Sequence, residues 1–160
     1  MLGYSKESSD SISEIQATED EIVACISELK SFPKPAFVAI KLSGLSPTAE
    51  LRGLEIDVTN LISTLPPASS SLTASQLRNL RTRYPEFFDR LARISRAASD
   101  AGVFLIMDAE IRYQDNIDSL PTFGILCSLL NSKKSHIWNT HQMYHVLSSA
   151  SNIAGSSRMA

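Results

Sequence analysis

The stretch VFLIMD, residues 103–108, decides the fold that this sequence predicts. Five consecutive apolar residues follow Gly102 and stop at a carboxylate, Asp108. The run shows no alternation between apolar and polar residues, which is typical of a strand buried on both faces within a parallel sheet. We therefore predict a buried strand over residues 103–107, with Asp108 at its carboxyl end.

Two other segments resemble this strand. Residues 36–40, AFVAI, are also continuously apolar and are followed directly by Lys41. Residues 137–140, IWNT, are a shorter third candidate. Together the three segments predict a sheet of short strands, two of which end at a charged residue.

Helices are expected before and between the first strands. Apolar residues recur at helical spacing over about residues 18–31, and Thr18 with Glu21 has the sequence of a capping box at the start. Residues 48–64 are apolar enough for a second helix, although the phase of their apolar residues is irregular.

A Ser-rich stretch separates these helices from the next helical region. Residues 65–75 have the composition of a linker or loop, and a helix is expected to open near Ser75. Pro85 should interrupt that helix. Residues 86–101 then show one clean apolar face, and Gly102 has the position of a C-terminal cap.

The order of these elements predicts an α/β fold in which parallel strands alternate with helices. Both a doubly wound sheet and a (β/α)8 barrel have this pattern, and both bind ligands beyond the carboxyl ends of their strands. Because parallel strands share one direction, Lys41, Asp108 and the group near Gln142 should lie on one common rim. A charged residue after a strand is often only the point where the chain reaches water, and Glu110 alone is more simply a solvated acid.

Composition excludes several classes of function. The 160 residues are 43% hydrophobic and 20% charged, which is typical of one globular unit, and a net charge of -2 gives no basic footprint for nucleic acid. Cys25 and Cys127 stand alone, and His136, His141 and His145 have no acid at ligand spacing, so we expect no metal site. The first residues show no targeting segment, and no apolar run reaches the length of a membrane span.

Four segments of the sequence resemble motifs of the proline dehydrogenase (proline oxidase) family, most closely its fungal members. They are LGYSKES at 2–8, FVAIKLSGL at 37–45, GVFLIMDAEIRYQDNID at 102–118 and IWNTHQMY at 137–144. The resemblance covers most of the chain and is weakest over residues 45–85. It implies a distorted (β/α)8 barrel that holds FAD without a covalent bond and oxidises L-proline to pyrroline-5-carboxylate.

The resemblance also implies roles for individual residues. Lys41 matches the lysine that pairs with the carboxylate of proline, and Asp108 matches the acidic catalytic residue. Met107 and Gln142 match flavin contacts, and Tyr144 matches the aromatic residue that closes the motif at the cofactor. The family further implies a quinone as electron acceptor, a mitochondrial location and a possible association with membranes.

The sequence departs from the family pattern in its extent. Family barrels are longer, and their later strands, with an Arg-Gly segment at the flavin and an arginine cluster over the proline carboxylate, have no counterpart in these 160 residues. We therefore expect a partial barrel domain over residues 1–160, which alone should retain little flavin and show no proline-dependent turnover. Two alternatives remain open: a non-catalytic fragment that acts, if at all, by associating with a partner, and an aldolase-type barrel with Lys41 as Schiff-base nucleophile.

Overall fold

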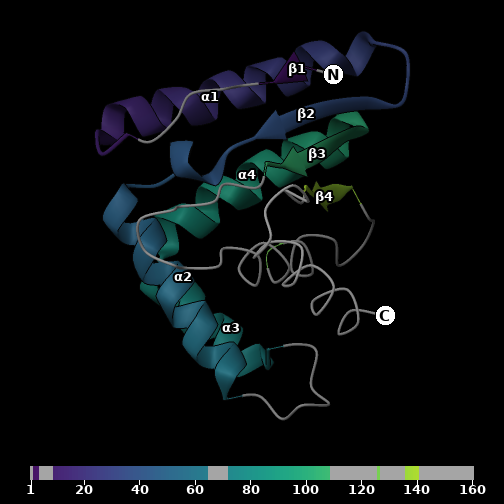
Figure 1. Ribbon diagram of the computed structural model, residues 1–160. Coiled ribbons are helices and arrows are strands. Elements are labelled where there is room, and N and C mark those ends of the chain that lie inside the picture. Colours follow the sequence, from purple (N-terminus) through teal and green to yellow (C-terminus); the bar gives the residue numbers. More distant parts are fainter. Residues whose placement is uncertain (1, 4–8, 65–71, 109–125, 127–135, 141–160) are drawn as a thin grey trace, which may run out of the picture.

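The protein has an α/β fold built on a four-stranded parallel sheet (Figure 1). The computed structural model describes residues 2–3, 9–64, 72–108, 126 and 136–140. The strands lie in the order in which they occur in the sequence, β1-β2-β3-β4, and every neighbouring pair is parallel. Their bounds are β1 Leu2–Gly3, β2 Ala36–Ile40, β3 Val103–Met107 and β4 Ile137–Asn139.

Three strands predicted from the sequence are therefore present. The bounds of β2 and β3 agree with the apolar runs 36–40 and 103–107, and β4 is one residue shorter than the segment 137–140. The two longest strands pair along their whole length, from Ala36 with Val103 to Ile40 with Met107. Of the expected linker over residues 65–75, only the last four residues are described, and the final two of them already belong to a helix.

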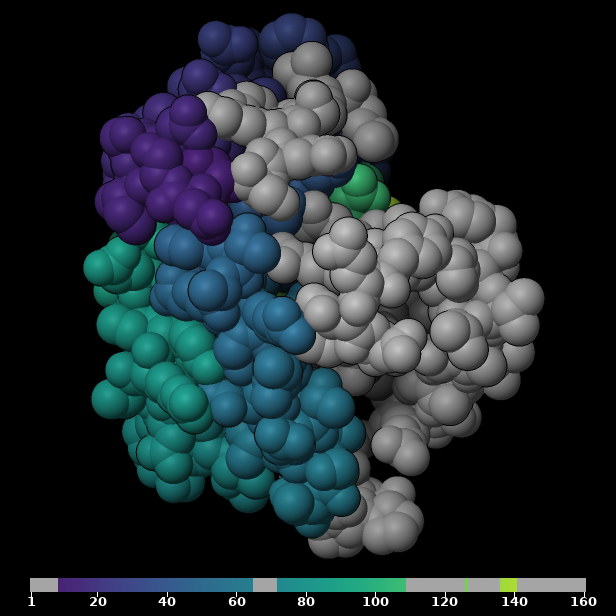
Figure 2. All heavy atoms as spheres, turned by 60° about the vertical axis from the view of Figure 1, so that its left-hand side comes forward, coloured from purple at the N-terminus to yellow at the C-terminus, as the bar shows by residue number. Residues whose placement is uncertain are grey.

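In residues 9–64 and 72–108, four α-helices and two short 3-10 turns accompany the strands. In chain order they are α1 Ile12–Glu28, η1 Leu29–Ser31, η2 Leu42–Gly44, α2 Thr48–Ser63, α3 Ala74–Arg83 and α4 Pro85–Ala101. Figure 2 shows α2 in blue beside the teal surface of α3 and α4 on the face that is turned forward. The predicted break at Pro85 is confirmed, because α3 ends before Tyr84 and Pro85 begins α4.

The predicted start of the first helix was wrong. The helix begins at Ile12, and Thr18 lies inside it, where its hydroxyl donates to the backbone oxygen of Glu14. The physical reason is that Ile15 is fully buried in register with the apolar positions further along α1, so the apolar face is longer than the predicted helix. A helix-interior hydroxyl that bonds to the preceding turn does not act as a cap.

Gly102 closes α4 as predicted. Its φ of 64° is left-handed, a conformation that glycine adopts without strain, and its backbone N–H reaches the carbonyls of the last helical turn. The chain therefore reverses between α4 and β3 without an intervening loop. This short connection places β3 directly against the helix that precedes it.

Helices α1 and α4 cover the same face of the sheet. They pack against each other, and their apolar side chains share one hydrophobic cluster with the strands. We call this side the packed face; its strand side chains are Ala36, Val38, Ile40, Val103, Leu105, Met107 and Ile137, all buried. Each strand therefore lies beside the previous one in the sequence, and the connecting helices α1 and α4 pack on the same side of the sheet.

The second face of the sheet is only half buried, which corrects the prediction of strands buried equally on both faces. Burial alternates along β2 and along β3, so every second side chain is less covered than its neighbours. We call this side the opposite face; its side chains are Phe37, Ala39, Phe104, Ile106 and Trp138. Three of these are aromatic and form one cluster in which each ring contacts both others, with ring centroids 5.3 to 5.7 Å apart.

Candidate functional site at the carboxyl ends of the strands

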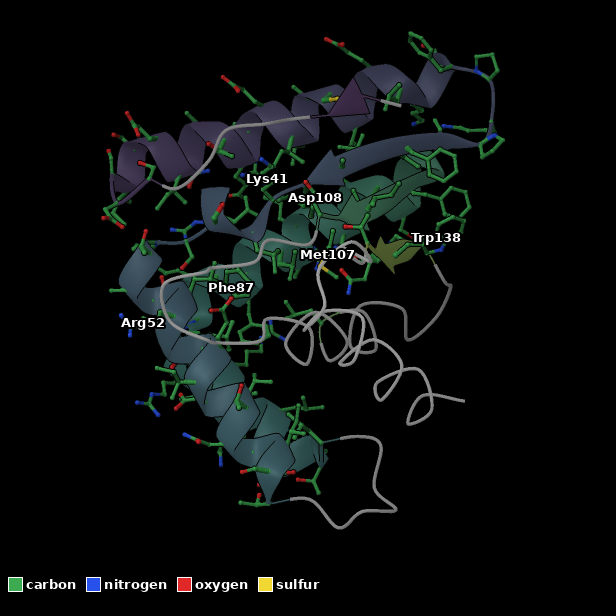
Figure 3. All side chains as sticks on the ribbon, in the orientation of Figure 1. Lys41, Arg52, Phe87, Met107, Asp108 and Trp138 are labelled. Atoms are coloured by element: carbon green, nitrogen blue, oxygen red, sulfur yellow. The ribbon has the colours of Figure 1, made fainter. Side chains whose placement is uncertain are left out.

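Lys41 and Asp108 lie side by side at one end of the sheet (Figure 3). Ile40 pairs with Met107 in the last rung of the β2–β3 ladder, and the backbone N–H of Asp108 then donates to the carbonyl of Ile40 over 2.9 Å. Lys41 and Asp108 are the residues that directly follow this last pair, one on each strand. The backbones of two such residues lie about 4.8 Å apart, the spacing between neighbouring strands.

The backbone at Lys41 is still extended, with φ -105° and ψ 127°. Side chains alternate between the two faces of an extended strand, so Lys41 belongs to the face that also carries Phe37 and Ala39. Both Lys41 and Asp108 are half buried. The sequence prediction of a common rim for these two residues agrees with this placement, whereas their chemical roles stay predictions.

Thr140 extends the row of polar groups to a third strand. Its backbone N–H donates to the carbonyl of Met107 over 3.0 Å, which continues the β3–β4 ladder by one residue. Its hydroxyl lies 3.2 Å from Oδ1 of Asp108 and 3.3 Å from the carbonyl oxygen of Met107. The sequence interpretation placed Thr140 at the end of the predicted strand 137–140, within a strand-end motif, and assigned it no role.

Of the three residues expected to contact a flavin, the structure describes only Met107. The side chain of Met107 is fully buried on the packed face, so a contact with a ligand at the rim would have to use its backbone. Gln142 and Tyr144 lie outside the described residues. Their assignment as flavin contacts stays a prediction.

A buried arginine holds the loop that follows Lys41. Arg90, on α4, donates from Nη1 to the carbonyl of Leu45 over 3.3 Å and from Nη2 to Glu86 over 2.9 Å. Its Nε lies 4.0 Å from the buried carboxylate of Glu19 on α1. Sequence reasoning missed this residue, although an arginine within the apolar face of residues 86–101 was a usable signal.

Glu19 also joins α1 to α4 through a second arginine. Arg93 donates to Glu19 and to Asp20, each over 2.9 Å, and these hydrogen bonds raise the pKa of the Arg93 guanidinium above its ordinary value. The helix layer behind the rim is therefore fixed by charged groups as well as by apolar packing.

His136 has a structural position between β4 and α4. Its Nε2 lies 3.2 Å from both the hydroxyl and the carbonyl oxygen of Ser95, and the ring is buried. Among the described residues there is no group of three His, Cys, Asp or Glu side chains that could hold a metal ion. Within the same part of the chain, no helix is long and apolar enough to cross a membrane.

Comparisons with known proteins support the fold. No family model matches the sequence, and no curated protein matches it. The structure is similar to the crystal structure of bifunctional proline utilization A (PutA) protein, with a TM-score of 0.62, 14% sequence identity and 99% of this chain covered. The chain spans only 14% of the length of that protein. At this identity the likeness shows that the two share a fold.

Proposed function

We propose that this chain is part of a (β/α)8 barrel of the proline dehydrogenase type, which oxidises L-proline to pyrroline-5-carboxylate with FAD. Two features of the fold support the barrel. The strands follow one another in sequence order, and α1 and α4 share one face, whereas a doubly wound sheet reverses its strand order and carries helices on both faces. The likeness to PutA points in the same direction.

The observation that carries the proposal is that Lys41 and Asp108 directly follow Ile40 and Met107, the last pair of residues in the β2–β3 ladder. Proline is a zwitterion, so its site needs a cation for the carboxylate and an acceptor for the amine. In our proposal Lys41 binds the carboxylate, and Asp108 accepts a hydrogen bond from the ring nitrogen. Half-buried charges attract a ligand more strongly than exposed ones, because less water screens them.

The described residues fit the substrate more fully than they fit the cofactor. FAD, when bound, supplies the acceptor for the hydride that leaves the ring carbon beside the nitrogen. The buried Oδ1 of Asn139 accepts no hydrogen bond within the described part of the chain, but Asn139 pairs with Met107, so its side chain belongs to the packed face and not to the face that carries Lys41 and Asp108. The proposed flavin contacts are Gln142, Tyr144 and the backbone of Met107.

The remaining parts of the proposal rest on the family resemblance. The electron acceptor would be a quinone, and the protein would act in the mitochondrion, with membrane association through that acceptor. The described residues bear on none of these points.

The test is binding of L-proline and FAD to a chain that completes the barrel and to its Lys41→Ala variant, measured by calorimetry or by NMR titration. We expect the variant to lose proline affinity by about 2 to 5 kcal/mol and to retain its flavin affinity, because the proposed partner of Lys41 is the substrate carboxylate. Lys30→Ala is the matched control, since this exposed lysine lies on η1 away from the rim. Equal proline affinity in both variants would exclude the proposed site.

A second experiment concerns the length of the barrel. Residues 1–160 expressed alone should show weak flavin absorption and no proline-dependent dye reduction, because each missing charge-assisted hydrogen bond costs roughly 1.5 to 3 kcal/mol of affinity. A yellow protein that turns over proline would show that this segment completes the site by itself.

One observation favours the alternative of a non-catalytic chain that associates with another polypeptide. Trp138 is 48% exposed in the aromatic cluster on the opposite face, and apolar surface of this kind is typical of protein contacts. Self-association that depends on Trp138, in a protein that binds neither proline nor FAD, would favour this alternative over the enzyme.

A further inference from the structure

The geometry around Thr140 assigns a role to a residue that the proposed function does not use. The Thr140 hydroxyl lies 3.2 Å from Oδ1 of Asp108, and the two side chains come from the ends of neighbouring strands, 32 residues apart in sequence. Both groups are at least half buried. The contact is therefore formed by the fold of the sheet and not by a local turn.

The hydroxyl has a single proton, and within the described residues two acceptors lie within its reach. One is Oδ1 of Asp108, and the other is the carbonyl oxygen of Met107 at 3.3 Å. A carboxylate is the stronger acceptor because its charge assists the hydrogen bond, and such bonds are roughly twice as strong as neutral ones. The carbonyl of Met107 also receives the backbone N–H of Thr140, so it does not depend on the hydroxyl.

Occupying one oxygen of a carboxylate fixes its orientation. With Oδ1 held by Thr140, rotation of the Asp108 carboxylate about its Cβ–Cγ bond is restricted. Within the described residues, Oδ2 of Asp108 accepts no hydrogen bond. One oxygen of the pair is thus committed to the protein, and the other is available to a ligand.

We propose that Thr140 is the positioning residue for Asp108, holding Oδ1 so that Oδ2 accepts a hydrogen bond from the amine of an amino-acid substrate. This role rests on the proposed function, because it takes the ligand from there. It adds the requirement that a hydroxyl must follow β4 at this position. A variant with a residue of the same shape but no hydroxyl at position 140 should fold as well as the wild type, and its Asp108 carboxylate should be held less firmly.

The test compares Thr140→Val with Thr140→Ser. Valine keeps the β-branched shape and the backbone N–H bond to Met107 but removes the hydroxyl, whereas serine keeps the hydroxyl. The first measurement is the ¹³C resonance of the Asp108 carboxyl carbon at a fixed neutral pH, without ligand. We expect this resonance to move in Thr140→Val and to stay near the wild-type position in Thr140→Ser.

The second measurement is the affinity of a chain that completes the barrel, by titration with L-proline and separately with FAD. Thr140→Val should weaken proline binding roughly tenfold, equivalent to about 1.4 kcal/mol, and leave FAD binding unchanged; Thr140→Ser should recover most of the loss. Urea unfolding of both variants shows whether they fold as the wild type does. A general loss of packing would weaken the binding of both proline and FAD, and Thr140→Ser would not restore it.

Two results would overturn the role of Thr140. One is an unmoved Asp108 resonance in Thr140→Val, and the other is unchanged proline affinity in that variant. A wild-type chain that completes the barrel and binds no proline would overturn the proposed function instead, together with the ligand part of this inference. The carboxyl resonance would then still decide whether Thr140 holds Asp108.

Discussion

The two faces of the sheet are made from the same five-residue runs and have different surroundings. On the packed face, Leu105 is fully buried beneath helices α1 and α4. On the opposite face its sequence neighbour, Ile106, is only half buried, and Trp138 is 48% exposed. The contrast shows that a continuous apolar run does not reveal how completely each of its faces is covered.

The comparison also separates stability from function. The packed face carries the hydrophobic cluster that joins helices to strands. Because side chains alternate along β2, the opposite face that carries Phe37 and Ala39 also carries Lys41 directly after the strand. The polar groups at the ends of the strands begin at this residue. We therefore expect substitutions on the packed face to act on folding and substitutions at the rim to act on ligands.

The largest predicted effect is the difference between Leu105→Ala and Ile106→Ala. Removing a fully buried leucine leaves a cavity, so the first variant should lose about 3 kcal/mol of unfolding free energy. The second should lose about 1 kcal/mol, because its side chain is already partly in water. Urea unfolding monitored by circular dichroism measures both, and equal losses would show that the opposite face is packed as closely as the packed face.

The next effect concerns the charges that hold the helix layer. Glu19→Ala removes the buried carboxylate between Arg90 and Arg93 and should cost about 2 kcal/mol, less than a fully buried pair because the side chain of Arg93 is half exposed. Asp20→Ala is the control: its side chain is exposed and its bond to Arg93 should contribute less than about 1 kcal/mol. Similar losses in both variants would mean that burial of Glu19 is unimportant.

A smaller effect is expected between α2 and α3, away from both faces. The hydroxyl of the buried Tyr84 donates to Asp57 over 2.6 Å, and burial, with this hydrogen bond and the charge of Asp57, raises the pKa of Tyr84 to about 12. Tyr84→Phe should cost about 1 kcal/mol at neutral pH, measured by urea unfolding.

The same tyrosine predicts a pH dependence. Its pKa is higher in the folded protein than the ordinary value of 10, so the folded state holds the proton more tightly. The resulting stability is fully present below pH 10 and is lost as the pH rises toward about 12. This loss of unfolding free energy at alkaline pH should be smaller in Tyr84→Phe. An identical dependence of unfolding free energy on pH in both proteins, between pH 9 and pH 12, would contradict the raised pKa of Tyr84.

The smallest predicted effect is that of Trp138→Phe. The indole is 48% exposed, and a phenyl ring keeps an aromatic contact with Phe104 across β3 and β4, so stability should change by less than about 0.5 kcal/mol. Thermal unfolding followed by circular dichroism provides the measurement. A loss above 2 kcal/mol would show that Trp138 is a core residue and would remove the contrast between the two faces.

Much of the fold could be predicted from local sequence patterns. The bounds of β2 and β3, the break at Pro85 and the cap at Gly102 depend on residues close to one another in the chain, and these predictions agree with the structure. The start of α1 was not predicted in this way, because Thr18 and Glu19, the buried positions between Ile15 and Ile22, are polar, and Glu19 is buried through its ion pairs with arginines of α4.

The candidate site shows the same division. The positions of Lys41 and Asp108 after two apolar runs are visible in the sequence, and parallel strands place such residues at one edge. The contact of Thr140 with Asp108 spans 32 residues and that of Arg90 with the Leu45 carbonyl spans 45. No local pattern specifies such pairs.

The sequence by itself determined the α/β class, the main strands and the polar residues that end two of them, because these follow from hydrophobic runs and chain-breaking residues within short windows. Only the tertiary structure decided the register that makes Lys41 and Asp108 neighbours, the covering of one face by α1 and α4, and the hydroxyl that meets the Asp108 carboxylate. These features depend on which strands pair and on which sides the helices pack. They arise from contacts between residues far apart in the chain, which form only when the chain folds.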